Sequence, residues 1–479
     1  MLFTDSTFLL RFLPVVLALF FIAVAVTPRR WRAGTRRFSL PNTVLFAGSV
    51  VFLAGVVGPF ARVIAGAVVF NYLGALAIDW ARRIGTSSSR PTPLPAALLT
   101  LAVTGNLVLL GVYKYAIPLG DGLVDRSFAA PQLLAPLGLT FIVCHSISYV
   151  VEVFRGSTPV QVSPIRASLY LIFFPLLCAG PLTRYSEMGP QLAQRRVTMA
   201  AFAYGVRRWL IGFCKVVFLA NTLAGPVEAV FSMPSGELGM TQAWLGAICF
   251  TLQIYLDLSG YADMGIGFGR MFGFRLFENF RWPYGAETLT EFWRRWNISL
   301  LDWCRSYLGL SLDDAGHSPI ARVRRTVVLF LCVGLWHGPG WSVVVWGVLN
   351  GAVVALEQAG LSRRIVRLPK ALRHAYLLFV VIGLWVVFRA ESLAGASVVL
   401  GAMTGVTGAT QASSLMLTPI HWTVLALAGL SVAPVWPSFG RWLVTVDALT
   451  TSVLILVSTT FIFIWRQLVN TARFLTSRR

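Results

Sequence analysis

A single histidine gives the clearest chemical signal in this sequence. His337 ends an apolar run, follows Trp336 and precedes the helix-breaking Gly-Pro-Gly at 338–340. An imidazole changes charge near neutral pH, which suits a general base. A lone histidine in an apolar run is usually a hydrogen-bonded core residue, but the backbone break and the flanking tryptophans favour function. The five histidines include no pair three or four residues apart, so no helix-borne metal site is predicted.

A second group of ionisable side chains lies in the run 255–275, which reads YLDLSGYADMGIGFGRMFGFR. Ionisable groups at membrane depth are costly and are therefore candidate functional groups. On a helix, Asp263 and Arg270 are seven residues apart and share a face, so we expect that they can pair. The glycines would allow close helix packing, and the alternative to a functional site is a polar contact that joins helices. The candidates here are Asp257, Ser259, Tyr261 and Asp263.

The third stretch, 288–307, combines aromatic and basic residues in the sequence TLTEFWRRWNISLLDWCRSY. Thr288 with Glu291 fits a capping box at the start of a helix. Tryptophan and arginine together are typical of the membrane interface, so anchoring alone explains the pattern. The functional interpretation is that the arginines bind an anionic group, such as a phosphate of an acyl donor. The candidates are Arg294, Arg295 and Trp296.

The elements that position these side chains must be helices in a lipid bilayer. Of the 479 residues, 56% are apolar and only 12% are charged, about half the charged share of a soluble domain. A soluble protein of this size could not cover so much apolar surface with so few polar side chains. The composition therefore excludes a disordered chain, a collagen-like chain and an ordinary cytosolic enzyme.

We expect roughly ten to thirteen membrane crossings, because a helix needs about 20 apolar residues to cross the hydrocarbon core. The Gly-Pro-Gly break predicts a bent or re-entrant element, since broken backbone is tolerated only where protein or water surrounds it. The chain is predicted to form one membrane domain, 1–479, with core motifs at 131–357 and peripheral helices at 1–130 and 358–479. The candidate spans are 8–27, 43–58, 62–80, 95–113, 131–152, 168–183, 203–223, 243–260, 326–337, 341–357, 372–388, 392–404, 421–437 and 450–467.

The strongly basic balance, 40 basic against 19 acidic residues, has two interpretations. It could indicate nucleic-acid binding, but the basic clusters lie between apolar runs, as in membrane proteins that keep Lys and Arg in cytoplasmic loops. We therefore expect no nucleic-acid partner, and we expect the loop at 29–37 and the stretches 361–373 and 473–479 to be cytoplasmic. The six scattered cysteines are predicted to be small buried hydrophobes.

Four longer stretches carry a resemblance to a known family. In sequence and in order they resemble the membrane-bound O-acyltransferase family, in the bacterial branch of alginate O-acetyltransferase and the D-alanine transfer protein of teichoic acids. They cover the central half of the chain, whereas the terminal regions match only as hydrophobic spans. The stretches are FPLLCAGPLTRYSEMGPQL at 174–192, LDLSGYADMGIGFGRMFGF at 256–274, ENFRWPYGAETLTEFWRRWNISLLDWCRSYL at 278–308 and GLWHGPGWSVVVWGVLNG at 334–351.

The resemblance implies an all-α, polytopic fold around a central acyl-transfer tunnel in the bacterial cytoplasmic (inner) membrane. A thioester donor, either acyl-CoA or an acyl-carrier thioester, would enter from the cytoplasm, and a polysaccharide or glycoside hydroxyl from the other side. His337 would be the catalytic general base, the other candidates would bind substrate or line the tunnel, and no tightly bound cofactor or metal is implied. In alginate-type systems an extracytoplasmic acetyltransferase takes over the acyl group, so a partner of that kind is an expectation here.

The chain departs from this branch at three places. Asn297 stands where the branch usually has the histidine of Arg-Arg-Trp-His-Ile-Ser-Leu. The wider superfamily often pairs Asn or Asp with the later histidine, so a catalytic role for Asn297 is still implied; an amide can orient the acceptor or bind the thioester oxygen, but it cannot shuttle a proton. Ser306 replaces the Asp of Arg-Asp-Tyr, and SLDDAGHS at 311–318 replaces a stretch like Ile-Pro-Leu-Gly-Gly-Asn.

Two other functions remain open from the sequence. A transporter or flippase would use the many spans, with Asp257 and Asp263 as ion-relay groups, although no inverted repeat supports it. A scaffold that keeps the family fold without activity is the second alternative, and the changes at Asn297 and Ser306 motivate it.

Overall fold

The computed structural model describes residues 2–27, 39–87, 92–116, 138–177, 180–310, 312, 318–405 and 417–432. Within these ranges every element of regular secondary structure is a helix and no strand occurs, which confirms the predicted all-α class. Several predictions concern residues outside the described ranges. They are the span 450–467, the end of the span 421–437, the basic segments 29–37 and 473–479, Cys178, His317 and most of 311–318.

Seven helical stretches in the described part of the chain are long and apolar enough to cross a membrane. One of them, Leu40–Gly85, has 46 residues, about 69 Å at 1.5 Å per residue and twice the hydrocarbon thickness. It bends where Gly58 takes a φ of 52°, which a side chain would disfavour. The predicted total of crossings also covers undescribed residues and stays a prediction. The stretches are Phe8–Val26, Leu40–Gly85, Leu94–Tyr115, Met199–Phe231, Met240–Met271, Trp341–Ile365 and Lys370–Arg389.

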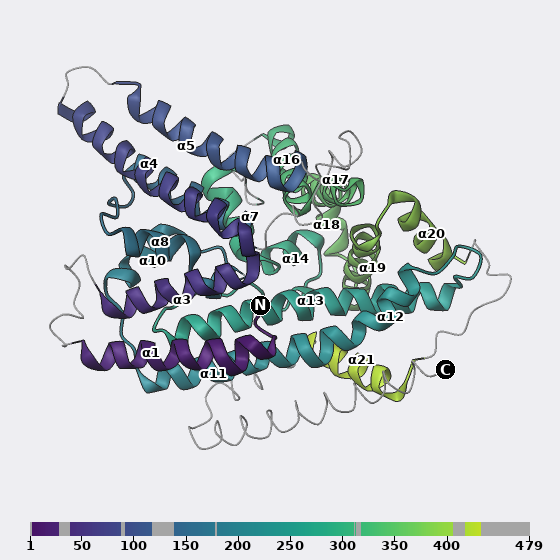
Figure 1. The fold of residues 1–479 in the computed structure, drawn as a ribbon. Helices are drawn as coiled ribbons and strands as arrows, with labels where there is room; N and C mark the ends of the chain where they lie inside the picture. Colours follow the sequence, from purple (N-terminus) through teal and green to yellow (C-terminus); the bar gives the residue numbers. More distant parts are fainter. Residues whose placement is uncertain are drawn as a thin grey trace, which may run out of the picture.

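In the first part of the chain α7 packs against α4 and α5, and α3 packs against α1 and α8 (Figure 1). The side chains of Asn71 on α4 and Asn106 on α5 form two reciprocal hydrogen bonds of 3.1 and 2.7 Å. Such pairs satisfy polar groups that lipid cannot. The elements are η1 Phe8–Phe12, α1 Leu13–Val26, α3 Leu40–Val57, η2 Gly58–Phe60, α4 Ala61–Ser87, α5 Leu94–Gly111, η3 Val112–Ala116, α7 Leu139–Arg155, α8 Pro164–Ile172, α9 Phe174–Leu177 and α10 Tyr185–Ala193.

The long helix α13 (Met240–Met271) runs through the middle of the molecule, with α11 (Met199–Cys214) and α12 (Asn221–Phe231) along one side (Figure 1). Glycines bring α11 and α13 together, as the sequence predicted. A Cβ added at Gly212 would lie 2.4 Å from the carbonyl oxygen of Gly260. The short η4 (Lys215–Ala220) joins α11 to α12.

The Gly-Pro-Gly break is a real helix boundary, because α16 (Pro319–His337) ends at His337 and α17 (Trp341–Leu356) begins after these three residues. The two helices form a tight hairpin in which a Cβ at Gly347 would meet the carbonyl oxygen of Phe330 at 2.5 Å. This confirms the predicted bent element. The remaining elements are η5 Pro283–Gly285, α14 Leu289–Arg295, α15 Ile298–Trp303, η6 Cys304–Leu308, η7 Glu357–Leu361, α18 Ser362–Ile365, α19 Lys370–Arg389, α20 Leu393–Met403 and α21 Pro419–Val432.

Four charged side chains join α11 and η4 to α13 and the loop that follows it. Arg208 contacts Asp263 at 2.6 Å and Glu278 at 2.5 Å, and the Lys215 ammonium lies 2.7 Å from the other oxygen of Asp263. The expected pairing of Asp263 with Arg270 is therefore wrong. Two cations on the facing segments reach Asp263 instead, and the Arg270 guanidinium lies over the Tyr204 ring at 5.5 Å.

We expect Asp263→Asn to destabilise the protein by about 3–5 kcal/mol, because it leaves the largely buried Lys215 ammonium without its counter-charge and Arg208 with Glu278 alone. The measurement is thermal unfolding in detergent. Asp302→Asn is the control: it removes an exposed ion pair with Arg305, which contributes at most about 1 kcal/mol. Equal changes in the two variants would contradict a supporting role for the buried network.

Candidate active site

A cavity of about 240 Å³ lies where the four motif stretches meet. Its walls are mostly aromatic and aliphatic, and the polar side chains among them are two asparagines, one histidine and tryptophan N–H groups. The lining residues are Phe141, Gly180, Leu182, Ile254, Leu258, Asn279, Phe280, Trp296, Asn297, Trp336, His337, Trp385 and Phe388.

Three aromatic rings hold the imidazole of His337 at the cavity wall. The ring meets Trp336, Trp346 and Phe388 edge-on, with centroid distances of 4.8, 5.4 and 5.0 Å. Its nitrogens make no hydrogen bond to any residue that the structure describes, and the side chain is half-buried because it lines the cavity. The imidazole is therefore fixed in direction by packing, while its nitrogens stay available to a bound molecule.

The end of α16 is held by a segment more than 200 residues earlier in the chain. The last carbonyls of a helix have no partner within the helix. Here the Tyr115 hydroxyl donates to the carbonyl of Leu335, and the Lys114 ammonium donates to the carbonyl of Trp336. The ammonium also lies 5.5 Å from the centroid of the Trp336 ring. These two side chains thus fix the helix end that carries His337.

The second polar group of the cavity is the Asn297 amide. Asn297 has a left-handed backbone, φ 45° and ψ 53°, in the turn between α14 and α15, a conformation that asparagine tolerates better than most residues. Its Oδ1 accepts a hydrogen bond of 3.1 Å from Nδ2 of Asn279. Its own Nδ2 has no partner among the described residues, so a cavity-lining amide keeps two donors for a ligand.

Four of the ten candidate site residues predicted from the sequence line this cavity, and the structure brings them together from two separate stretches. They are Trp296, Asn297, Trp336 and His337. The other six, which were predicted to bind substrate or line the tunnel, do not line this cavity. They are Asp257, Ser259, Tyr261, Asp263, Arg294 and Arg295.

The first four of these six are on α13, but it is Ile254 and Leu258 that α13 turns toward the cavity. Asp263 and Ser259 lie with Lys215 on the side that faces α11 and η4. Tyr261 is turned to the N-terminal segment, where its ring centroid is 6.3 Å from that of Phe3.

Neither of the two arginines of α14 lines the cavity. Arg294 is exposed, and Arg295 pairs with Glu291. The predicted helix start is present, since the Thr288 hydroxyl accepts from the backbone N–H of Glu291 at 3.1 Å. The reciprocal capping bond differs from the prediction, because the Glu291 carboxylate accepts from the N–H of Glu287 instead.

Sequence reasoning missed several cavity residues. Asn279 lies inside a quoted motif stretch, and its amide beside a run of aromatic residues was an available signal. Lys114 also carried a signal, as one of three lysines in the chain and within an apolar run. Nothing local marks Phe141, Trp385 or Phe388, because only tertiary packing brings α7 and α19 to His337.

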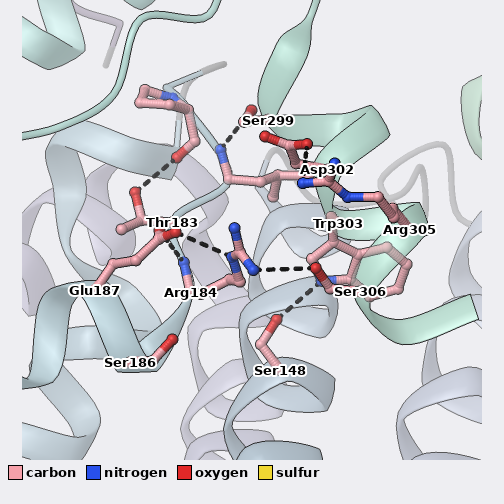
Figure 2. A network of polar contacts seen from close by, with 12 residues as sticks. Ser148, Thr183, Arg184, Ser186, Glu187, Ser299, Asp302, Trp303, Arg305 and Ser306 are labelled. Carbon is pink, nitrogen blue, oxygen red and sulfur yellow. Dashed lines mark hydrogen bonds and ion pairs between the residues drawn. The ribbon is translucent and has the colours of Figure 1, made fainter. Parts of the chain in front are cut away.

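A polar network lies next to the cavity, between the loop before α10 and η6 (Figure 2). Arg184 contacts Glu187 at 3.0 Å and the Ser306 hydroxyl at 3.1 Å, and Trp303 donates to Ser148 at 2.9 Å. Burial raises the pKa of Glu187, and the neighbouring Arg184 opposes this shift. The sequence departure at Ser306 therefore concerns the partner of Arg184 and not a cavity residue.

Comparison with known proteins identifies the class. The model of the membrane-bound O-acyltransferase family matches residues 122–398, and the chain belongs to this family. It is a multi-pass membrane enzyme that transfers acyl groups to hydroxyls.

Three relatives within this family are similar to the chain to different degrees. A probable alginate O-acetylase AlgI from Azotobacter vinelandii is 38% identical over 405 residues, which are 82% of this chain and 76% of the relative. A peptidoglycan O-acetyltransferase from Helicobacter pylori is 30% identical, over 85% of this chain and 80% of the relative. A teichoic acid D-alanyltransferase from Bacillus subtilis is more distant, 21% identical over 47% of this chain and 59% of the relative.

We expect the double substitution Lys114→Met with Tyr115→Phe to lower the rate of acyl transfer about tenfold. A carbonyl that loses its donor in an apolar environment costs up to about 1–3 kcal/mol, and without these two donors the end of α16 and His337 can move. The measurement is turnover with a thioester donor in reconstituted vesicles. Tyr72→Phe is the control, because it removes a hydrogen bond to the carbonyl of Val162, outside the cavity. Full turnover in the double variant would show that these caps do not position the histidine.

Proposed function

We propose that this protein transfers an acetyl group from a cytoplasmic thioester to a hydroxyl of a polysaccharide or glycoside, with His337 as the general base. The observation that carries the proposal is the position of His337, whose nitrogens are available at the wall of a largely apolar cavity. Relatives named for the O-acetylation of alginate and of peptidoglycan support an acetyl donor and a glycan acceptor.

The reaction would proceed by direct attack. His337 takes the proton of the acceptor hydroxyl as its oxygen attacks the thioester carbonyl carbon. The tetrahedral intermediate then collapses, the carbon–sulfur bond breaks, and the thiolate leaves with the proton from His337. No serine, threonine or cysteine is among the described residues that line the cavity, which supports transfer without an acyl-enzyme intermediate. Holding both substrates in one cavity supplies rate through orientation.

The Asn297 amide would stabilise the negative oxygen of that intermediate. A donor aimed at developing charge in a site without water contributes about 100–1,000-fold to turnover. The amide of Asn297 keeps its Nδ2 hydrogens unpaired among the described residues, while its oxygen is occupied by Asn279. Asn297 therefore binds the oxyanion, and proton transfer belongs to His337 alone.

The size and walls of the cavity favour a short acyl group. Pockets for drug-sized ligands have about 300–1,000 Å³, and this cavity has about 240 Å³. Six of its lining residues are Phe or Trp, and such rigid side chains leave little room for a long chain to bend. An acetyl group on a thiol arm fits these limits.

The proposal also includes the donor, the acceptor and the membrane in which the reaction takes place. The donor is a soluble thioester, either acyl-CoA or an acyl-carrier thioester, and the membrane is the bacterial cytoplasmic one. The acceptor hydroxyl belongs to an extracytoplasmic polysaccharide or glycoside, reached directly or through an extracytoplasmic acetyltransferase partner. The mechanism requires no tightly bound cofactor and no metal.

One alternative has a specific observation in its favour. Asn297 and Ser306 differ from the branch, which motivates a scaffold without activity. Ser306 contacts Arg184 outside the cavity, however, and Asn297 retains a donor in the cavity, so both residues are compatible with an active enzyme.

We expect His337→Ala to lower acetyl transfer by about 100–10,000-fold, the usual contribution of a general base. The measurement is transfer from labelled acetyl-CoA to glycan in vesicles, with correct insertion checked separately. His374→Ala is the matched control, since that ring lies 3.2 Å from the carbonyl of Ala286 and outside the cavity. Wild-type transfer by His337→Ala would end the proposal, and substrate flux without any acyl donor would favour a transporter.

We expect Asn297→Ala to lower turnover about 100-fold with a small change in KM, because the lost bond forms mainly in the transition state. Asn297→His restores a donor and should keep measurable turnover. If the unmodified protein is inactive and Asn297→His adds no acyl transfer, the alternative of a scaffold without activity is favoured.

A further inference from the structure

Both the oxygen and the nitrogen of the Asn279 side chain form hydrogen bonds with neighbouring residues. Asn279 is 5% exposed. Its Oδ1 accepts from the backbone N–H of Ser299 at 3.0 Å and from the Ser299 hydroxyl at 2.9 Å, and its Nδ2 donates to Oδ1 of Asn297 at 3.1 Å. Its backbone carbonyl also accepts from the N–H of Ile298 at 3.0 Å.

These contacts determine which way each amide points. A backbone N–H can only donate, so the atom of Asn279 that faces Ser299 must be the oxygen. The nitrogen of Asn279 then faces Asn297, and Asn297 must present its own oxygen in return. The opposite orientation of Asn297 would place two NH₂ groups against each other. The direction of both amides is thus set by the main chain and not by an arbitrary choice of orientation.

A second main-chain amide extends the same chain of donors. The N–H of Leu182 donates to the Ser299 hydroxyl oxygen at 2.9 Å, and the hydroxyl donates its own hydrogen to Oδ1 of Asn279. Every hydrogen bond therefore runs in one direction, from Leu182 through Ser299 to Asn279, and Asn279 donates onward to Asn297. Leu182 comes from the first motif stretch, so this chain joins it to the third.

We propose that Asn279 is a positioning residue: it fixes the Asn297 amide so that Nδ2, and not Oδ1, is presented to the substrate carbonyl. The inference rests on the proposed function, in which Asn297 stabilises the oxyanion. A flipped Asn297 would present a partial negative charge to a developing negative charge, and the transition state would lose its donor. Asn279 acts through Asn297 and takes no part in proton transfer.

The sharpest test is Asn279→Asp, which keeps the shape and the oxygen that faces Ser299 but replaces the donor by an acceptor. Asn297 then turns its Nδ2 toward the new carboxylate and its oxygen toward the substrate. We expect kcat for acetyl transfer in vesicles to fall about 100-fold, to the level of Asn297→Ala, while KM for the donor stays within about threefold.

The double variants separate positioning from general support. If Asn279 acts through Asn297, then Asn279→Asp or Asn279→Ala in the Asn297→Ala background should lower kcat no further. Asn279→Ala also serves if the aspartate variant does not fold, and alone it should lower kcat to a lesser degree, because the Asn297 amide is then free to rotate. Additive losses in the double variants would overturn the proposal.

Asn106→Asp is the matched control. It alters another buried asparagine pair, Asn71 with Asn106, away from the cavity, and should lower the melting temperature without lowering kcat. Wild-type kcat in Asn279→Asp, with a loss in Asn297→Ala, would overturn the positioning role and leave the proposed function intact. Wild-type kcat in Asn297→Ala would overturn both the positioning role of Asn279 and the oxyanion role of Asn297, whereas a loss of kcat in His337→Ala would still support the histidine as base.

Discussion

Satisfying the last carbonyls of a helix is the constraint on which this site depends. A helix can end inside a membrane protein only where other groups of the protein or water bind its free carbonyls. At the end of α16 the side chains of Lys114 and Tyr115 do this, and the Gly-Pro-Gly at 338–340 lets the chain reverse into α17. The result is a polar side chain, His337, held at the edge of an apolar cavity. The aromatic contacts of that ring follow from where the helix stops.

Polar groups inside a membrane protein need partners from the protein itself, and few are left without one at the cavity. Elsewhere, two buried carboxylates are satisfied by several groups of the protein itself. Asp263 is bound by Arg208 and Lys215, and the Glu357 carboxylate, 1% exposed, accepts from two backbone N–H groups at the start of α14. Such internal pairing stabilises the packing and leaves no free charge to compete for a ligand at these places. In the cavity, by contrast, the His337 nitrogens and the Nδ2 of Asn297 stay available.

The membrane setting and the helix end at the site could be predicted from the sequence, because the first depends on composition and the second on residues adjacent in the chain. The apolar share indicated a bilayer, the Gly-Pro-Gly indicated the end of α16, and Trp336 and His337 are near the cavity because they adjoin that break. The polar residues of α13 could not be placed in the same way. A helix has several faces, and the pattern of 255–275 does not say which face meets a cavity. The partner of Asp263 is likewise set by a helix more than 50 residues away, which sequence spacing along α13 cannot reveal.

The orientation of the Asn297 amide could not be predicted from the sequence, since it depends on two main-chain amides and a second asparagine.

The most direct test of the account is a structure with a non-hydrolysable acetyl-thioester analogue that keeps the carbonyl. The account expects that carbonyl oxygen about 3 Å from Nδ2 of Asn297, with the carbonyl carbon next to the His337 ring. An analogue bound elsewhere, with the His337 ring out of reach of its carbonyl group, would contradict it.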